Sequence, residues 1–348
     1  MRERLSIIAS GAVLVVVIGW LLHVGKAIFI PIAFSVLAVY VIVGLASLIA
    51  KFPFLGKLLP TRVRYALAVL VIAVVAVEVL YLVVASKDAI AAFAPRLQET
   101  LLAGMQKVAS FAHIETEPTW ETLRQDLLTQ IDAQKFLRAM FASVASTLVS
   151  IEIVVLYACF LLFERRTFVT KLEALAYNSR KVARMQEILN LISVRIGSYL
   201  ALKTFLGALL GVMSWIAMTL IGLEFAAFWA VLIGLLNYIP YVGPLLGIAL
   251  PVTMAIVQFA SPGEVLAVLL ALVVIYACIG YFLDPYIMGS SLNLSPLAIL
   301  VSLTIWAELW GIPGAFLAIP ITAIVTIVLS EIPRTRPIAV LLSRADPP

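Results

Sequence analysis

Long apolar stretches recur along nearly the whole of this 348-residue chain, and they constrain its fold more than any other feature. Apolar residues make up 64% of the chain and charged residues only 12%, whereas a soluble domain is about half apolar and about a quarter charged. The composition excludes a soluble globular domain and a disordered chain. The stretches do not alternate polar with apolar residues, which excludes an outer-membrane barrel. We expect an all-α polytopic membrane protein.

Six apolar stretches have about the length of one membrane-crossing helix, which takes roughly 20 residues. They cover residues 6–22, 27–50, 65–86, 141–163, 204–222 and 265–283. The basic start of the first stretch resembles a signal peptide, but it lacks a small-residue cleavage site, so we expect an uncleaved span. With the two longer stretches described below, the sequence predicts about eight transmembrane segments.

Lysine and arginine set the expected orientation, because they are enriched on the cytoplasmic side of membrane spans. Basic residues are in excess at the N-terminus, in 51–64 and in 164–203, whereas 87–140 has slightly more acids than bases. Alternation then places both termini in the cytoplasm and 87–140 outside. We expect 164–203 to form a basic amphipathic helix on the anionic inner leaflet, with a regulatory or gating role as the alternative.

Two further apolar stretches, 226–259 and 297–329, are interrupted by glycine and proline. As a single helix, the 34 residues of the first would extend about 51 Å, against a hydrocarbon core of about 30 Å. Proline removes a backbone donor and clashes with the preceding turn, so these stretches must break. We favour two hairpins over two broken crossings. The alternative without a substrate role is a pair of ordinary kinked or closely paired helices.

A pair of broken apolar segments in corresponding positions indicates the transport site of a secondary transporter. Free backbone groups at membrane depth must be buried in protein or line a wet cavity. We therefore expect a substrate path along both breaks, with two hydroxyl side chains beside it. Its candidate residues are Asn237, Tyr238, Pro240, Tyr241, Gly243, Pro244, Gly311, Pro313, Ser302 and Thr304.

Asn237 offers both a hydrogen-bond donor and an acceptor beside the first break, as a hydroxyl-rich neutral substrate requires. An interhelical hydrogen bond is the alternative interpretation. Gly207 and Gly211 form a GxxxG motif, which predicts close helix packing and no chemistry.

Four carboxyl groups in or beside apolar stretches are candidates for ion coupling, since a charge inside a span is costly and generally faces a cavity or a partner. Glu308 lies three residues before the second break and is a candidate proton carrier. The alternative interpretation is that Glu308 is protonated and hydrogen-bonded, or that it faces another subunit. Asp284, at the end of a span, either caps or gates that span or is a solvated loop acid. Glu152 and Glu78 are further ion-coupling candidates, and the alternative is that each pairs with a basic residue of another helix.

Motifs for other functions are missing from the sequence. It contains no HExxH, P-loop or GxSxG motif, so neither an enzyme nor an ATP-driven pump is expected. Two cysteines and two histidines do not provide a convincing four-ligand zinc site. We expect no cofactor, no metal and no nucleic-acid partner, because the basic residues lie in loops and not in a patch with aromatics. Membrane lipids and a small-molecule or ion substrate are the expected partners.

Over residues 190–330 the sequence resembles the autoinducer-2 exporter family of bacterial inner-membrane proteins. The resemblance is carried by NYIPYVGPLLGIALP at 237–251, by Asp284-Pro285 with Met288-Gly289, by LNLSP at 292–296, and by LWG at 309–311 with AIP at 318–320. It is weaker before residue 190, where mainly the layout of the spans agrees. The sequence departs from the family pattern at Tyr281, Tyr286 and Glu308.

The resemblance implies export of small molecules, with autoinducer-2 for some members and sodium–proton antiport for others. It also implies homo-oligomers, for which pentamers with elevator-like movement are one expectation. We expect a secondary active exporter of a small polar metabolite or signal molecule in the bacterial inner membrane. The first alternative is a sodium–proton antiporter. The second is a membrane scaffold or channel without coupled transport.

These expectations divide the chain into five regions. Residues 1–86 form a three-span region, 87–140 an extracytoplasmic helical segment, and 141–203 the fourth span with its basic segment. Residues 204–333 form the transport core with both broken segments, and 334–348 form a cytoplasmic tail.

Overall fold

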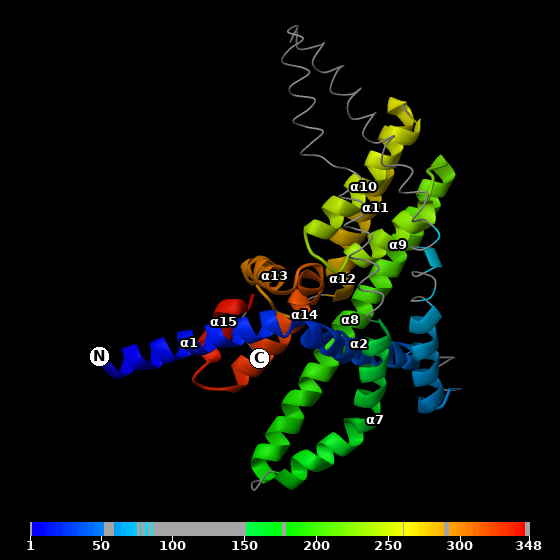
Figure 1. Cartoon of the computed structure of the whole chain (residues 1–348). Helices are drawn as coiled ribbons and strands as arrows, with labels where there is room; N and C mark the ends of the chain where they lie inside the picture. The colour runs from blue at the N-terminus through cyan, green and yellow to red at the C-terminus, as the bar shows by residue number, and fades with distance from the viewer. Residues whose placement is uncertain are drawn as a thin grey trace. The chain divides into compact units, whose positions relative to one another are not determined.

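The structure is a computed structural model of the chain, and it describes residues 2–51, 59–74, 77, 81–82, 85, 151–175, 179–259, 261–288 and 292–344. The described residues form helices joined by short turns (Figure 1). Among them, the backbone bridge between Leu294 and Ser343 is the only pairing of the β type. The expected all-α membrane class is confirmed. The predicted segment 87–140 and Glu78 lie outside the described residues.

The helices follow one another with few interruptions in the described ranges. In chain order they are α1 (Arg2–Val24), α2 (Lys26–Lys51), α7 (Ile151–Leu175), α8 (Ser179–Ile221), α9 (Ala226–Leu236), α10 (Val242–Phe259), α11 (Pro262–Ala277), the π-helix η1 (Cys278–Leu283), α12 (Asp284–Met288), α13 (Pro296–Trp310), α14 (Ile312–Glu331) and α15 (Arg336–Leu342). Residues 61–74 are helical as well.

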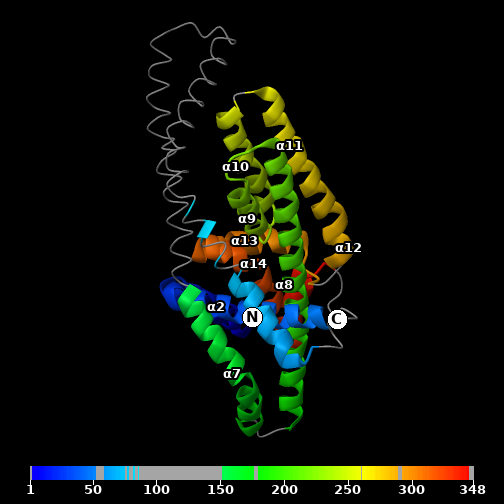
Figure 2. The same cartoon turned by 90° about the vertical axis from the view of Figure 1, so that its right-hand side faces the viewer.

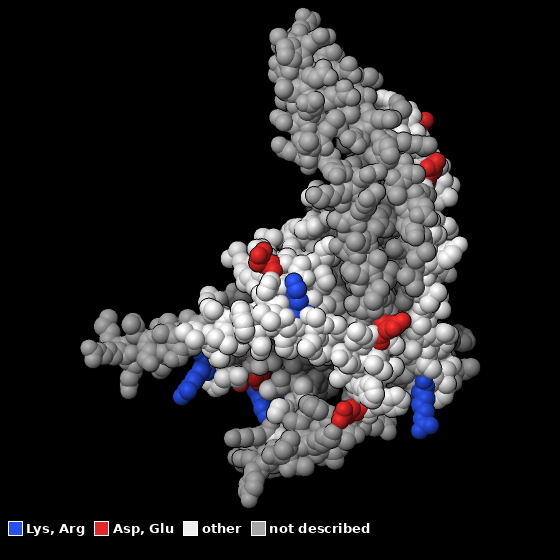
Figure 3. All heavy atoms as spheres, in the orientation of Figure 1, with Lys and Arg blue, Asp and Glu red and all other residues white. Residues whose placement is uncertain are grey.

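Five described stretches are long and apolar enough to cross a membrane: 26–47, 182–221, 242–259, 262–287 and 312–331. The helices α9 and α13 are apolar but shorter. On the face drawn in Figure 3, the described charged side chains are few and scattered among uncharged residues. The described helices therefore present the surface expected of a protein surrounded by lipid.

The basic segment 164–203 does not form a separate surface helix, which corrects the prediction. Residues 164–175 continue α7, and residues 179–203 belong to α8, an unbroken helix of 43 residues that Figure 2 shows as one long rod. At 1.5 Å per residue it extends about 65 Å. It contains no proline, so nothing ends the helix between its basic and apolar parts. Part of α8 must project beyond a core of about 30 Å.

The chain divides into two compact units. Unit 1 consists of Met1–Leu70, Ser150–Leu202 and Met288–Pro348, and unit 2 of Val71–Val149 and Lys203–Ile287. The helix α8 therefore gives its first part to unit 1 and its last part to unit 2.

Small residues bring the helices of unit 1 together. In α2, the Ser35 hydroxyl donates a hydrogen bond of 2.9 Å to the Val154 carbonyl of α7. Further along α2, a Cβ built on Gly44 would lie 2.5 Å from the Gly197 carbonyl oxygen of α8. Only glycine permits two helix backbones to approach so closely.

The second broken segment is a hairpin within unit 1. Helix α13 ends and α14 begins at a single residue, Gly311, with φ 67° and ψ −142°. Across the hairpin, the Trp306 Nε1 donates to the Thr322 Oγ1 at 3.3 Å. Of the two candidate residues of this break, only Gly311 lies between the helices, because Pro313 stands in the first turn of α14, where no backbone donor is needed.

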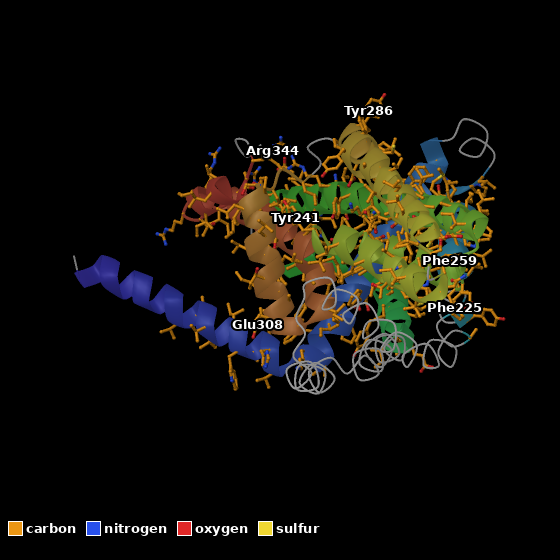
Figure 4. All side chains as sticks on the ribbon, turned by 90° about the horizontal axis from the view of Figure 1, so that it is seen from above. Phe225, Tyr241, Phe259, Tyr286, Glu308 and Arg344 are labelled. Carbon is orange, nitrogen blue, oxygen red and sulfur yellow. The ribbon has the colours of Figure 1, made fainter. Side chains whose placement is uncertain are left out.

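The first broken segment is a hairpin within unit 2. The Gln258 amide near the end of α10 accepts from the Glu224 backbone N–H and donates to the Gly222 carbonyl, both at 2.8 Å. These bonds join the end of the hairpin to its beginning, and Figure 4 shows Phe225 and Phe259 close together with Tyr241 away from them. Both segments therefore fold as helical hairpins, and their return to the side of the membrane from which they enter stays a prediction.

The first break is also shorter than predicted. It covers residues 237–241, and α10 begins at Val242. Pro244 stands in the first turn of α10 and Pro251 inside it, so these two prolines do not end a helix. The physical reason for Pro244 is that the first turn has no intrahelical partner for its backbone donors.

The GxxxG motif packs α8 against α9 as predicted. A Cβ built on Gly207 would lie 2.8 Å from the Gly234 carbonyl oxygen, and one on Gly211 would lie 2.9 Å from that of Ala230. This contact fixes the broken end of α9 beside the middle of α8, where the candidate site lies.

Candidate functional site

Polar side chains of unit 2 gather where the break meets α8. The hydroxyl oxygens of Tyr238 and Thr204 lie 2.5 Å apart, so one donates to the other. The Asn237 Nδ2 lies 3.6 Å from a Cβ built on Gly207. Thr204 and Gly207 are one helical turn apart on one face of α8. The two polar residues of the break therefore both meet that face.

The residue preceding Thr204 in α8 forms an ion pair. The Lys203 Nζ donates to the Asp284 Oδ2 at 3.0 Å, and the two side chains are only 11% and 26% exposed. The pair joins α8 to the start of α12. A buried ion pair balances its own charge, but removing either partner leaves a charge that the interior does not compensate.

The π-helix η1 places Asp284 in this pair. The Asp284 backbone N–H bonds to the carbonyl of Ile279, five residues earlier. Asp284 therefore lies one wide turn after Ile279 on the same side of the helix, and Ile279 is only 8% exposed. The intervening Tyr281 and Phe282 are 81% and 74% exposed. In an α-helix the fourth residue, Leu283, would occupy the stacked position. The extra residue in the turn thus brings the carboxylate to the buried face.

Two atoms of this region are buried without a hydrogen-bond partner among the described residues. They are the Asp284 Oδ1, an acceptor, and the Asn237 Nδ2, a donor. An unsatisfied buried polar group costs about 1–3 kcal/mol, and such groups in a native protein require an explanation. We refer to Lys203, Thr204, Asn237, Tyr238 and Asp284 as the polar cluster. The two unpaired atoms, one acceptor and one donor, make this cluster the candidate ligand site.

The other predicted residues of the first break shape the turn. Tyr241 has φ 61°, and its side chain is exposed. Gly243 is buried, and a Cβ there would clash with the Leu236 carbonyl. Pro240 is half-buried, as is Pro244. These residues position the cluster without adding a hydrogen-bonding side chain to it.

The predicted residues of the second hairpin belong to unit 1. The Ser302 and Thr304 hydroxyls donate to carbonyls four residues earlier in α13, which satisfies them within their own helix. Gly311 and Pro313 form the turn described above. Their participation in a common path with Asn237 stays a prediction.

The four candidate acids differ in their surroundings. Glu308, at the tip of the second hairpin (Figure 4), and Glu152, in the first turn of α7, are both exposed. Asp284 is half-buried and paired, so it is not a solvated loop acid. Proton transfer by Glu308 stays a prediction.

Sequence reasoning missed Lys203 and Thr204 as site residues. One signal was present: no basic residue occurs between Lys203 and Arg334. Asp284 lies in that stretch at the end of an apolar span, where a buried carboxylate requires a nearby cation. Lys203 is the first cation preceding it.

The apolar helices define a multi-pass membrane protein, and the polar cluster is its candidate functional site. The sequence profile of the "AI-2E family transporter" matches residues 11–334. The chain belongs to this family, and its role is membrane transport.

Three relatives come from Escherichia coli K12. The protein YhhT is 28% identical over 318 residues, covering 89% of this chain and 87% of YhhT. The AI-2 transport protein TqsA is 33% identical over 211 residues, covering 61% and 60% of the two chains. The permease-type protein PerM is 27% identical over 214 residues, with the same coverage.

Proposed function

We propose that this protein is a secondary active exporter of a small polar metabolite or signal molecule. It resides in the bacterial inner membrane with both termini in the cytoplasm, and it functions as a homo-oligomer. The observation that carries the proposal is the polar cluster, which combines a half-buried ion pair with two unpaired polar atoms, one of them at the break of a hairpin. Similarity to a protein named for AI-2 transport supports an autoinducer-2-like substrate.

The chemistry of the cluster indicates the substrate class. Lys203 and Asp284 together carry no net charge, so a neutral ligand adds no uncompensated charge to the interior. The Asp284 Oδ1 needs a donor, and the Asn237 Nδ2 needs an acceptor. A hydroxyl group provides both functions, so a small molecule with more than one hydroxyl matches the hydrogen-bonding needs of both atoms.

Sodium–proton antiport is the second candidate function. It is favoured by the one unpaired oxygen of Asp284, because carboxylate oxygens are ligands for hard cations. In the exporter the same carboxylate binds substrate, whereas in the antiporter it binds the cation.

Efflux from liposomes tests the two candidates together. The purified full chain is reconstituted in liposomes that contain autoinducer-2 and a pH-sensitive dye, with and without a sodium gradient. We expect more efflux from these liposomes than from liposomes without the protein, accompanied by a pH change. A sodium-driven pH change without efflux establishes the antiporter. Efflux that responds to neither gradient indicates a channel, and no signal from folded protein contradicts both candidates.

A matched pair of variants ties the efflux to the cluster. Asn237→Leu removes the unpaired amide, and Thr253→Val removes a hydroxyl of the same hairpin that bonds only to its own helix, at the Ala249 carbonyl. We expect about tenfold or greater loss of efflux for Asn237→Leu, the effect of one lost hydrogen bond in the interior. Thr253→Val is expected to retain it. Equal effects would place the substrate site elsewhere.

A further inference from the structure

Charged residues are few in residues 203–287, the part of unit 2 that contains the polar cluster. Between residues 203 and 287 the sequence has one base, Lys203, and three acids, Glu224, Glu264 and Asp284. Glu224 and Glu264 are exposed, and Glu224 bonds through its backbone to Gln258 at the far end of the hairpin. In that stretch, Lys203 and Asp284 are therefore the charged side chains removed from solvent.

We propose that Lys203 determines the charge class of ligand that the polar cluster accepts, and that it makes the cluster selective for neutral molecules. The inference rests on the proposed function in that it takes the cluster as the ligand site. It adds a specificity determinant and predicts how that specificity changes.

The geometry gives the reason for neutral selectivity. The Lys203 ammonium occupies one oxygen of Asp284 at 3.0 Å, and the other oxygen is unpaired. A cation at that second oxygen would lie close to the ammonium and be repelled by it. An anion near Lys203 would meet the carboxylate in the same way. These like-charge repulsions are strong in an interior of low dielectric constant, and they reject wrong ligands.

Removing one partner is expected to invert this preference. Lys203→Gln leaves the Asp284 carboxylate uncompensated, so a ligand cation replaces the lost ammonium. Asp284→Asn leaves the ammonium uncompensated, so a ligand anion replaces the lost carboxylate. The two variants thus change selectivity in opposite directions, which a merely structural role of the pair would not produce.

Three probes of similar size test the inference: ethylene glycol is neutral, ethanolammonium is a cation and glycolate is an anion. Their binding to the full chain in detergent is measured by saturation-transfer NMR at mildly alkaline pH. We expect wild type to prefer ethylene glycol. We expect Lys203→Gln to prefer ethanolammonium and Asp284→Asn to prefer glycolate, each by about tenfold or more, the size of one charge-assisted hydrogen bond.

Two control variants isolate the effect of charge. Lys203→Arg keeps the ion pair and is expected to keep the neutral preference. The double variant Lys203→Gln/Asp284→Asn has no charge and is expected to prefer the neutral probe as well. If a single variant is too unstable for NMR, its melting temperature is measured with each probe, because a ligand stabilises the folded state that binds it.

The inference is overturned if both single variants keep the probe preference of wild type. It is also overturned if both change in the same direction. Its failure differs from failure of the proposed function, which is read from efflux. Efflux with unchanged probe preference removes the inference alone, whereas inverted preference without efflux leaves a charge-selective site and removes the exporter.

Discussion

Tyr241 and Gly311 are the residues at which the two hairpins acquire a positive φ, 61° and 67° respectively. Glycine adopts such a conformation without steric cost, whereas an L side chain loses roughly 1–2 kcal/mol in the left-handed region. Both turns therefore contain a residue with a positive φ, and Gly311, with ψ −142°, lies outside the left-handed helical region. The glycine is matched to its conformation, and the tyrosine is strained.

Substitutions at these two positions are expected to have opposite effects. Gly311→Ala should lower stability by about 1–3 kcal/mol, because alanine cannot occupy this conformation without strain. Tyr241→Gly should raise it by about 0.5–1 kcal/mol, because relief of strain exceeds the greater freedom of the unfolded chain. Melting temperatures in detergent measure both. A shift of the same sign in both variants would contradict the strain argument.

At this scale the sequence predicted some site residues and not others. Asn237 and Asp284 were found because a polar group in an apolar stretch is conspicuous. Lys203 was not, because its partner lies 81 residues away in the chain and across a helix contact that no local pattern specifies. Tyr241 could not be assigned its positive φ, since tyrosine rarely adopts one.

Among the elements, α8 and α9 are joined by a contact that admits no side chain at Gly207. Gly207→Ala is expected to destabilise the protein by about 1–3 kcal/mol, because the added methyl group forces the backbones apart. The matched control is Gly19→Ala in α1, where a Cβ meets nothing within 4 Å. That control should be neutral or stabilising by up to about 1 kcal/mol. Thermal unfolding of the two variants measures the difference, and equal shifts would show that the contact is not tight.

The helical elements were largely predictable, whereas their exact continuity was not. Apolar runs and Gly/Pro positions identified both hairpins. The change from basic to apolar composition near residue 203 suggests a boundary, but α8 continues through it, because nothing in the backbone ends the helix there. The π-helix η1 was missed because a 3.6-residue periodicity assumes a regular turn. A regular α-helix would place Leu283, and not Asp284, on the buried face.

For the whole molecule, the prediction that follows from the basic loops concerns sidedness. Both termini are expected in the cytoplasm, so green fluorescent protein fused after Pro348 should fluoresce in cells and alkaline phosphatase fused there should be inactive. Fusions at the N-terminus are expected to give the same result. An active phosphatase at either end would contradict the orientation.

The hydrogen bonds that join the two ends of the first hairpin affect how the chain tolerates changes in the hairpin's length and sequence. Because Gln258 bonds back to Gly222 and Glu224, the polypeptide leaves and re-enters the body of unit 2 at one place. A segment that returns to its starting point adds an even number to the count of crossings. It can be lengthened, shortened or exchanged for that of a relative without reversing the side on which any later helix ends. The hairpin that carries Asn237 and Tyr238 of the polar cluster is thereby free to diversify while the orientation of the rest is inherited unchanged.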